Sequence, residues 1–326
     1  MKRSFVFDQL HAEGLISDAS YDKLKFEQEK GLLSVHWEIK TLLYLGVLLL
    51  SAGLGTMVYK NIDTIGHQVI LLFIALVCAG CFFYCTKNKA PFSTVKVAAP
   101  NSFFDYILLL GCCTLLTFIA YLQFQYNLFG NRYGLAIFFP MLVLFFSAYY
   151  FDHLGVLSMA IVNLGAWLGI TVTPMQLLES NDFSSAPIIF TGLALGIVLL
   201  LVAWVTRKKN IKKHFEFTYA NFGTHLLLIS ILAAMFYFGG IFMAWFLALM
   251  LLSFLLYKKA LHDKSFYFIL IITLYAFIGI TYVVLNLLDR IGGGMTAIYL
   301  GFIYFIVAGI GLVMFLMRTN KKLKTI

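Results

Sequence analysis

The chain alternates between long apolar blocks and short polar gaps, and this alternation predicts its secondary structure. Each block holds roughly 20 residues, the length that a helix needs to cross the ~30 Å hydrocarbon core of a bilayer. A helix is expected because it satisfies all of its backbone hydrogen bonds within the segment. The pattern therefore predicts an all-α fold, a polytopic transmembrane helix bundle of about ten spans. Their approximate bounds are Ile39–Tyr59, Gly66–Thr86, Asp105–Tyr126, Tyr133–Phe151, His153–Thr173, Pro187–Thr206, Ala220–Gly239, Gly240–Tyr257, Ser265–Leu288 and Met295–Met317.

Two pairs of spans are poorly separated in the sequence. The seventh and eighth spans share 38 residues with only Gly239 and Gly240 between them, and the fourth and fifth are separated only by Asp152 and His153. Each stretch is too long for one crossing, so two helices are expected. A pair of re-entrant segments is the alternative, which leaves the number of spans between 8 and 10. Either interpretation keeps the flanking segments on the same side of the membrane.

The first 38 residues are polar and predict a small helical hairpin. A first helix near 5–13 ends at Gly14, and Ser17 is expected to cap a second helix. A hairpin of this size buries too little apolar surface to be stable alone, so it should dock on the membrane domain or on a companion membrane or cytoplasmic protein. The predicted organisation is a cytoplasmic helical hairpin at 1–38, a transmembrane helical domain at 39–317 and a basic cytoplasmic tail at 318–326.

Lysine and arginine are sorted between the gaps. Of the 24 basic residues, 20 lie at the two termini and in the even-numbered gaps, while the odd gaps hold only Lys60, Arg132 and Arg290; Lys40 lies at the edge of the first span. By the positive-inside rule, the cation-rich side is cytoplasmic, which predicts a multi-pass membrane protein with both termini in the cytoplasm.

Composition agrees with an integral membrane protein. Hydrophobic residues make up 61% of the chain and charged residues 12%, with a mean hydropathy of +0.90. The pI near 9.2 could suggest nucleic acid. The cations border apolar blocks, however, without an aromatic stacking platform or a basic groove. We therefore expect a lipid bilayer with anionic headgroups as the partner, and no nucleic acid.

Five cysteines form the first candidate site. Cys78, Cys81 and Cys85 share one face of the second span, and Cys112 and Cys113 lie at a similar depth on the antiparallel third span. Thiolates bind copper(I), zinc or iron-sulfur clusters, so a metal or redox site is chemically conceivable. Unpaired cysteine also behaves as a small apolar residue, and no cation lies nearby to favour a thiolate. We favour the packing interpretation and expect no metal or other cofactor.

Small residues predict a close helix contact. Gly165 and Gly169 form a GxxxG motif on the fifth span, and Gly192 and Gly196 form another on the sixth. Antiparallel packing of these spans would bring Gly165 near Gly196 and Gly169 near Gly192, as small-residue interfaces do in lipid. The alternative is that these glycines are unrelated small residues.

Two polar features remain as candidate binding residues. Asn163 is the strongly polar side chain nearest a predicted midplane, where it could serve a site or simply bond a neighbouring helix. Arg207, Lys208, Lys209, Lys212 and Lys213 form a basic run that is expected to contact anionic lipid headgroups, or else serves only as a topology signal.

Motifs for catalysis are missing from the sequence, so we do not expect an enzyme. There is no HExxH, GxSxG or Walker sequence. The carboxylates outside the amino-terminal segment lie at predicted span boundaries or in loops, which argues against an ion pathway through the bundle. They include Asp105, Asp152, Asp263 and Asp289.

The amino-terminal segment resembles a known family. The stretch Leu10-His11-Ala12-Glu13-Gly14-Leu15-Ile16-Ser17, followed by Tyr21, Leu24, Gly31 and Trp37, is similar to uncharacterised bacterial predicted membrane proteins that share a domain of unknown function. The resemblance is best over about residues 5–60. It implies a bacterial inner-membrane protein that works beside companion membrane proteins, and it carries no catalytic residues.

Three hypotheses for the function follow. The leading one is a non-enzymatic scaffold or membrane-complex subunit whose segment 1–38 binds a partner. The second is a transporter or permease for an apolar or lipid-like substrate, with a site near Asn163. The third and weakest is a thiol-based metal or redox membrane protein that uses the five cysteines.

Overall fold

The computed structural model describes residues 11, 16–18, 20, 21, 36–172, 185–292 and 295–325. Within these ranges it holds ten long α-helices, two short 3-10 helices and no strand. The elements are α3 (His36–Ile65), α4 (His67–Asn88), α5 (Ser102–Tyr126), α6 (Tyr133–Phe151), α7 (Leu154–Val172), α9 (Ala186–Lys209), η1 (Lys213–Phe215), α10 (Glu216–Tyr237), η2 (Gly239–Ile241), α11 (Phe242–His262), α12 (Phe266–Gly292) and α13 (Met295–Thr325).

The predicted all-helical, polytopic fold is confirmed. Ten helices in the described ranges are long and apolar enough to cross a membrane. Their bounds agree with the predicted spans to within a few residues at most ends. Larger differences occur where polar residues extend an apolar helix: α10 begins at Glu216 rather than near residue 220, and α13 continues to Thr325. The basic residues of the predicted tail therefore lie on the last turns of α13, where cations interact favourably with the helix dipole.

Both poorly separated pairs consist of two full-length helices. Asp152 adopts a left-handed conformation with φ of 60°, and the N–H of His153 donates to the carbonyl of Ala148 at 3.0 Å, which ends α6. Phe238 leaves the helical conformation, and η2 then separates α10 from α11. The four helices are 19 to 22 residues long, as full crossings require.

The chain divides into two compact units, Met1–Met57 and Val58–Ile326. In the first unit, the Oγ of Ser17 accepts a hydrogen bond from the backbone N–H of Ser20 at 3.4 Å, as the predicted helix cap requires. The rest of the predicted hairpin, including Gly14 and the first helix, lies largely outside the described residues.

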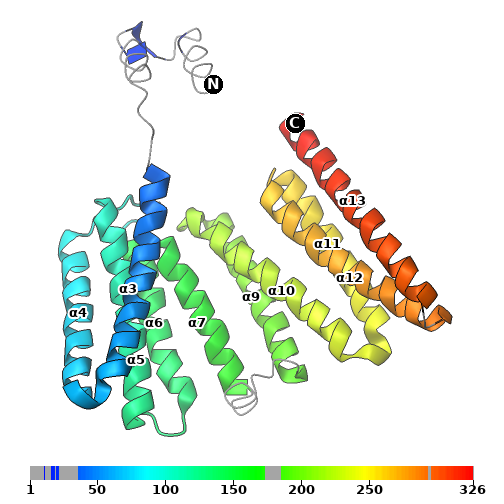
Figure 1. Ribbon diagram of the computed structural model, residues 1–326. Helices are drawn as coiled ribbons and strands as arrows, with labels where there is room; N and C mark the ends of the chain where they lie inside the picture. The colour runs from blue at the N-terminus through cyan, green and yellow to red at the C-terminus, as the bar shows by residue number, and fades with distance from the viewer. Residues whose placement is uncertain are drawn as a thin grey trace. The chain divides into compact units, whose positions relative to one another are not determined.

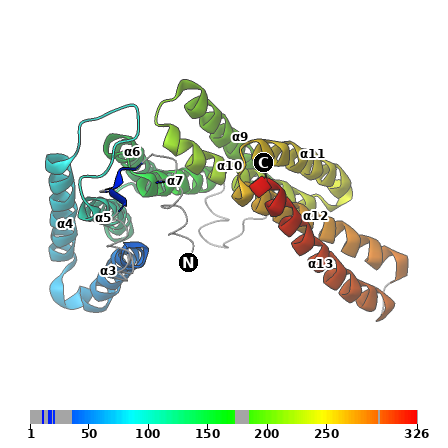
Figure 2. The ribbon, with the colours of Figure 1, turned by 90° about the horizontal axis from the view of Figure 1, so that it is seen from above.

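In the second unit, two apolar cores meet at α9 and α10. One core gathers buried side chains from α4, α5, α6, α7, α9 and α10, and the other gathers them from α10, α11 and α12. Figure 1 shows these helices running back and forth along the chain, and the connections between them alternate from one end to the other. In Figure 2 the connection between α4 and α5 is seen as a long loop at one end of the helices. The even-numbered gaps of the sequence thus lie at one end of the unit, which we call the cation-rich end.

Candidate functional site

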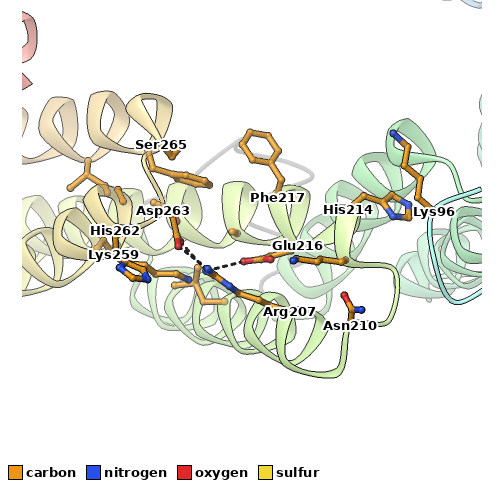
Figure 3. A pocket seen from close by; sticks show the side chains of 18 of the residues that line it. Lys96, Arg207, Asn210, His214, Glu216, Phe217, Lys259, His262, Asp263 and Ser265 are labelled. Atoms are coloured by element: carbon orange, nitrogen blue, oxygen red, sulfur yellow. Dashed lines mark hydrogen bonds and ion pairs between the residues drawn. The ribbon is translucent and has the colours of Figure 1, made fainter. Parts of the chain in front are cut away.

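A pocket of about 720 Å³ opens at the cation-rich end, where α9, α10, α11 and α12 meet. Its volume lies within the range of ~300–1,000 Å³ that is typical of ligand sites. The inner wall is apolar and comes from all four helices: Leu200, Ala220, Leu256, Phe268 and Ile272. The mouth is polar, and the side chains that surround it are drawn in Figure 3.

The pocket extends into the membrane-spanning part of the helices. Leu200 lies nine residues before the end of α9 at Lys209, and Thr224 lies eight residues after the start of α10 at Glu216. At 1.5 Å per residue, the pocket reaches ~12–14 Å from the helix ends, and the other apolar wall residues lie nearer to those ends. This depth is under half of a ~30 Å hydrocarbon core. The pocket therefore combines a polar mouth near the helix ends with an apolar wall inside segments that are apolar enough to span a membrane.

Arg207 connects the elements at the centre of the mouth. Its guanidinium donates two hydrogen bonds to the carboxylate of Asp263, at 2.8 and 3.0 Å, and lies 3.5 Å from an oxygen of Glu216. These contacts join the end of α9 to the start of α10 and to the α11–α12 turn, as the dashed lines in Figure 3 show. The hydrogen bonds from Arg207 hold the pKa of the Asp263 carboxyl below its usual range. Asp263 thus remains an anion and keeps Arg207 in place.

Basic side chains flank this central ion pair on both sides. In Figure 3, Lys96 and His214 lie on one side of Arg207 and Glu216, whereas Lys259 and His262 lie on the other. Lys213 is the neighbour of His214 in η1 and also lines the pocket. Four cations, counting Arg207, therefore face two carboxylates, so the mouth carries a surplus of two positive charges when its histidines are neutral.

A buried ion cluster next to the pocket holds the α4–α5 loop in place. Asp152 accepts from the ammonium of Lys212 at 3.0 Å and lies 2.7 Å from the Nε2 of His214, and the side chains of Asp152 and Lys212 are 3% and 2% exposed. Its second oxygen accepts from the backbone N–H of Val97, and the backbone N–H of Lys212 donates to the carbonyl of Thr94 at 2.6 Å. Because a buried charge needs a partner, this cluster positions the loop that carries Lys96 into the pocket mouth.

The five cysteines lie at the contact between α4 and α5. Cys81, Cys85 and Cys112 are buried, and the Cys78 thiol donates to the carbonyl of Gly111 at 3.6 Å. A Cβ atom added at Gly111 would lie only 2.9 Å from that of Cys81, so the two helices approach closely here. Across the described residues, no three His, Cys, Asp or Glu side chains come together in a way that could hold a metal. Cys81, Cys85 and Cys112 are thus buried where α4 packs against α5.

The glycine motif of α9 faces α10, whereas the sequence predicts that it packs against the glycines of α7. A Cβ added at Gly196 would lie 2.9 Å from the backbone nitrogen of Leu227, and one added at Gly192 would meet Ser230. Gly165 of α7 instead faces the side chain of Leu195, at 3.9 Å from an added Cβ. Gly169, the second glycine of the predicted motif on the fifth span, lies on α7. The glycines of α9 thus allow the close approach of α9 and α10, two of the four helices around the pocket.

Of the remaining residues predicted as candidate sites, some line the pocket and others lie elsewhere. The amide of Asn163 donates to the carbonyl of Met159 in its own helix at 3.1 Å, and Asn163 is not among the pocket residues. Of the basic run, Arg207 and Lys213 line the pocket and Lys212 is buried against Asp152. Lys208 and Lys209 are exposed and lie outside the pocket, with the ammonium of Lys208 over the ring of Trp204.

Several pocket residues were not identified from the sequence as a site: Lys96, His214, Glu216, Lys259 and His262. Asp263 had been noted only as a boundary carboxylate. The alternation of cation-rich and cation-poor gaps along the sequence could have indicated them, because the second, sixth and eighth gaps all lie at the cation-rich end. Which of their side chains share a pocket depends on helix packing.

Comparison with known proteins bears on the amino-terminal half. Comparisons with curated proteins and with solved structures gave no match. The matched family segment contains the loop that carries Lys96 and the acid at 152, whereas the pocket residues from Leu200 onward lie beyond it. The resemblance noted in the amino-terminal segment is confirmed: residues 8–157 match the family described as "Predicted membrane protein (DUF2157)".

Proposed function

We propose that this multi-pass membrane protein binds an anionic, lipid-like molecule in the pocket between α9, α10, α11 and α12. The observation that carries the proposal is the combination of an apolar wall within the spans and a cationic mouth at their ends. An amphiphile could place its acyl chains along the wall and its acidic head among the lysines. This proposal develops the lipid-substrate hypothesis of the sequence analysis but moves the site from Asn163 to the cation-rich end.

The position of the mouth matches where anionic headgroups lie. By the positive-inside rule, we infer that the cation-rich end and both termini face the cytoplasm. Lys96 and Lys213 have no carboxylate within ion-pair distance among the described residues, so both ammonium groups are open to a ligand. Each cation near an anionic surface contributes about 1 kcal/mol of attraction. An ordinary neutral lipid would leave this charge unused.

Lipid binding to purified protein tests the proposal. The protein is delipidated in a neutral detergent, and the binding of phosphatidylglycerol is compared with that of phosphatidylcholine with the same acyl chains, by native mass spectrometry. We expect saturable binding of the anionic lipid that is weakened about tenfold or more in the double variant Lys213→Gln/Lys259→Gln, in which the mouth loses two charges.

The chain offers a matched control. Lys208→Gln/Lys209→Gln removes the same charge from exposed positions that do not line the pocket. If the two double variants lose binding equally, the lipid is held by the general surface charge and the pocket proposal is wrong. Equal binding of both lipids by the unaltered protein would also contradict it.

The scaffold role of residues 1–38 stays a separate proposal. It is supported by the polar character of this segment, most of which lies outside the described residues. Deleting residues 1–38 should abolish recovery of a companion protein in pull-downs while leaving lipid binding in the pocket intact. Recovery of the same companion by the truncated protein would exclude this role.

A further inference from the structure

The two cationic flanks of the pocket mouth indicate a ligand with two acidic groups. In Figure 3, Lys96 and His214 lie on one flank, and Lys259 and His262 lie on the other; Lys213, the neighbour of His214 in η1, also lines the pocket. They come from separate elements: the α4–α5 loop and η1 on one side, and the end of α11 on the other. A ligand that uses the whole mouth must therefore present negative charge at two positions.

The centre of the mouth is unfavourable for a single anionic head. Arg207 lies there, but its guanidinium is already engaged by two carboxylates, Asp263 and Glu216. These carboxylates hold the strong bidentate donor of the site, and they repel an anion placed between the flanks. An acidic group is therefore attracted most strongly when it binds toward one flank or the other. Outside this centre, lysine ammonium groups offer at least one positive charge on each flank, enough for one monoanionic phosphate on each side.

We propose that the ligand is a phospholipid with two phosphodiester groups joined by a short linker, of the cardiolipin type. This inference rests on the proposed function, since it specifies the head of the lipid that the pocket would bind. Each phosphate would sit with one flank, and the linker would cross the Arg207 ion pair. Lysine suits this role because its ammonium has three donors on a flexible stem and can adjust to a phosphate.

Linking two phosphates strengthens binding without any new contact. Once the first phosphate is bound, the second is held near its flank at a high effective concentration, and gains of 10²–10⁴ are known for such pairs. The acyl chains restrict how the head can place its two phosphates, so we expect a gain below this range, of about tenfold. Two separate single-phosphate lipids would lose this advantage even at the same total phosphate concentration.

One flank of the pocket mouth is held in place by the buried ion cluster around Asp152. Lys96 is carried by a loop that Asp152 and Lys212 hold through the N–H of Val97 and the carbonyl of Thr94. His214 contacts Asp152 at 2.7 Å and also lines the pocket. One flank is therefore built by the α4–α5 loop, the α6–α7 turn and the α9–α10 turn together.

Competition among three lipids tests the inference on full-length protein in neutral detergent. Cardiolipin, phosphatidylglycerol and phosphatidic acid with matched acyl chains are compared at equal total phosphate. We expect cardiolipin to bind about tenfold more tightly than either of the others. Phosphatidic acid distinguishes the effect of total charge from the effect of two spaced phosphates, because its single phosphate carries up to two negative charges in one place.

Variants on each flank supply the second arm. Lys96→Gln and Lys259→Gln should each bring cardiolipin affinity close to that of phosphatidylglycerol, while phosphatidylglycerol itself, which can use the intact flank, changes by less than about threefold. The control Lys208→Gln, outside the pocket, should leave the cardiolipin preference unchanged. Gel filtration and the binding of phosphatidylglycerol verify that each variant is folded.

The outcomes separate the two proposals. Equal affinity for cardiolipin and phosphatidylglycerol at matched phosphate would overturn the two-phosphate inference and leave the proposed function standing. Equal affinity for cardiolipin and phosphatidic acid would overturn it as well, because charge alone would then suffice. If none of the three acidic lipids binds better than phosphatidylcholine, the proposed function fails together with the inference. Full competition by soluble glycerol 3-phosphate would identify a site for a free phosphate and contradict both.

Discussion

Replacing Asp152 by asparagine tests the role of the buried ion cluster. The side chains of Asp152 and Lys212 are almost fully buried, with their charged atoms 3.0 Å apart. The neutral amide would leave the ammonium of Lys212 buried without a counter-charge. Breaking a buried pair in this way typically costs about 3–5 kcal/mol. Asparagine is chosen because φ at this position is 60°, where alanine would add about 1–2 kcal/mol of backbone strain.

Two buried thiols provide the assay. Cys85 and Cys112 are 0% exposed, so a thiol-reactive fluorescent dye reports unfolding in detergent as they become accessible. At about 2 °C per kcal/mol for a large chain, the expected loss is about 6–10 °C in apparent Tm. The same variant should also weaken lipid binding, because the cluster that holds the loop carrying Lys96 would lose its anion.

A double variant isolates the buried charge as the cause. Adding Lys212→Met removes the orphaned ammonium, so Asp152→Asn/Lys212→Met should recover most of the lost stability. Lys208→Met is the matched control, since it removes an exposed cation of the same basic run. A shift of less than about 2 °C for Asp152→Asn would refute the reasoning. So would a double variant that is less stable than Asp152→Asn alone.

Three further predictions follow from the same structure. Because Arg207 lowers the pKa of the Asp263 carboxyl, the stabilisation from this pair is present above the unfolded-state pKa near 4 and is lost as pH falls through the lower folded value. Asp263→Asn should thus have a lower apparent Tm than the unaltered protein at pH 7. The difference in apparent Tm between the two proteins should become smaller at pH 3, and an unchanged difference would contradict this reasoning. Cysteines at Gly192→Cys and Ser230→Cys should form a disulfide under mild oxidation, with Tm and gel mobility as readouts, because a Cβ at 192 would lie 3.5 Å from that of Ser230; an unlinked but folded protein would reject the packing of α9 on α10. In a background without native cysteines, Lys96→Cys and Arg132→Cys should react with an impermeant thiol reagent from opposite sides of the membrane. If both variants reacted from the same side, the alternation of the gaps would be wrong.

The sequence was sufficient for the secondary structure and the order of the spans. Apolar blocks of about 20 residues have one stable solution in lipid, a helix, so the ten helices could be placed with errors of only a few residues at most ends. The separation of α6 from α7 also followed from length, although the left-handed turn at Asp152 that produces it was visible only in the structure. The gap parity was correct in placing the second, sixth and eighth gaps at one end.

The candidate site could be predicted only in part. Lys212 and Lys213 are neighbours in one basic run and look alike in the sequence, yet one is buried against Asp152 and the other lines the pocket. Lys96 and Lys259 are far apart in the chain, and gap parity assigns both to one end of the unit without indicating that they line the same pocket. Their placement depends on which helices pack together and on how each connection turns.

What the sequence by itself determined was a membrane protein, its helices and the end of the bundle that collects the cations. Only the tertiary structure decided that the glycines of α9 pack against α10, that Asp152 holds the α4–α5 loop and that a pocket opens beside Arg207. The physical reason lies in the solvent. A helix in lipid is apolar on the faces that contact other helices and on those that contact acyl chains, so its pattern does not distinguish inward from outward positions. Helix partners are then chosen by shape and by a few buried polar contacts, which form between residues distant in the chain.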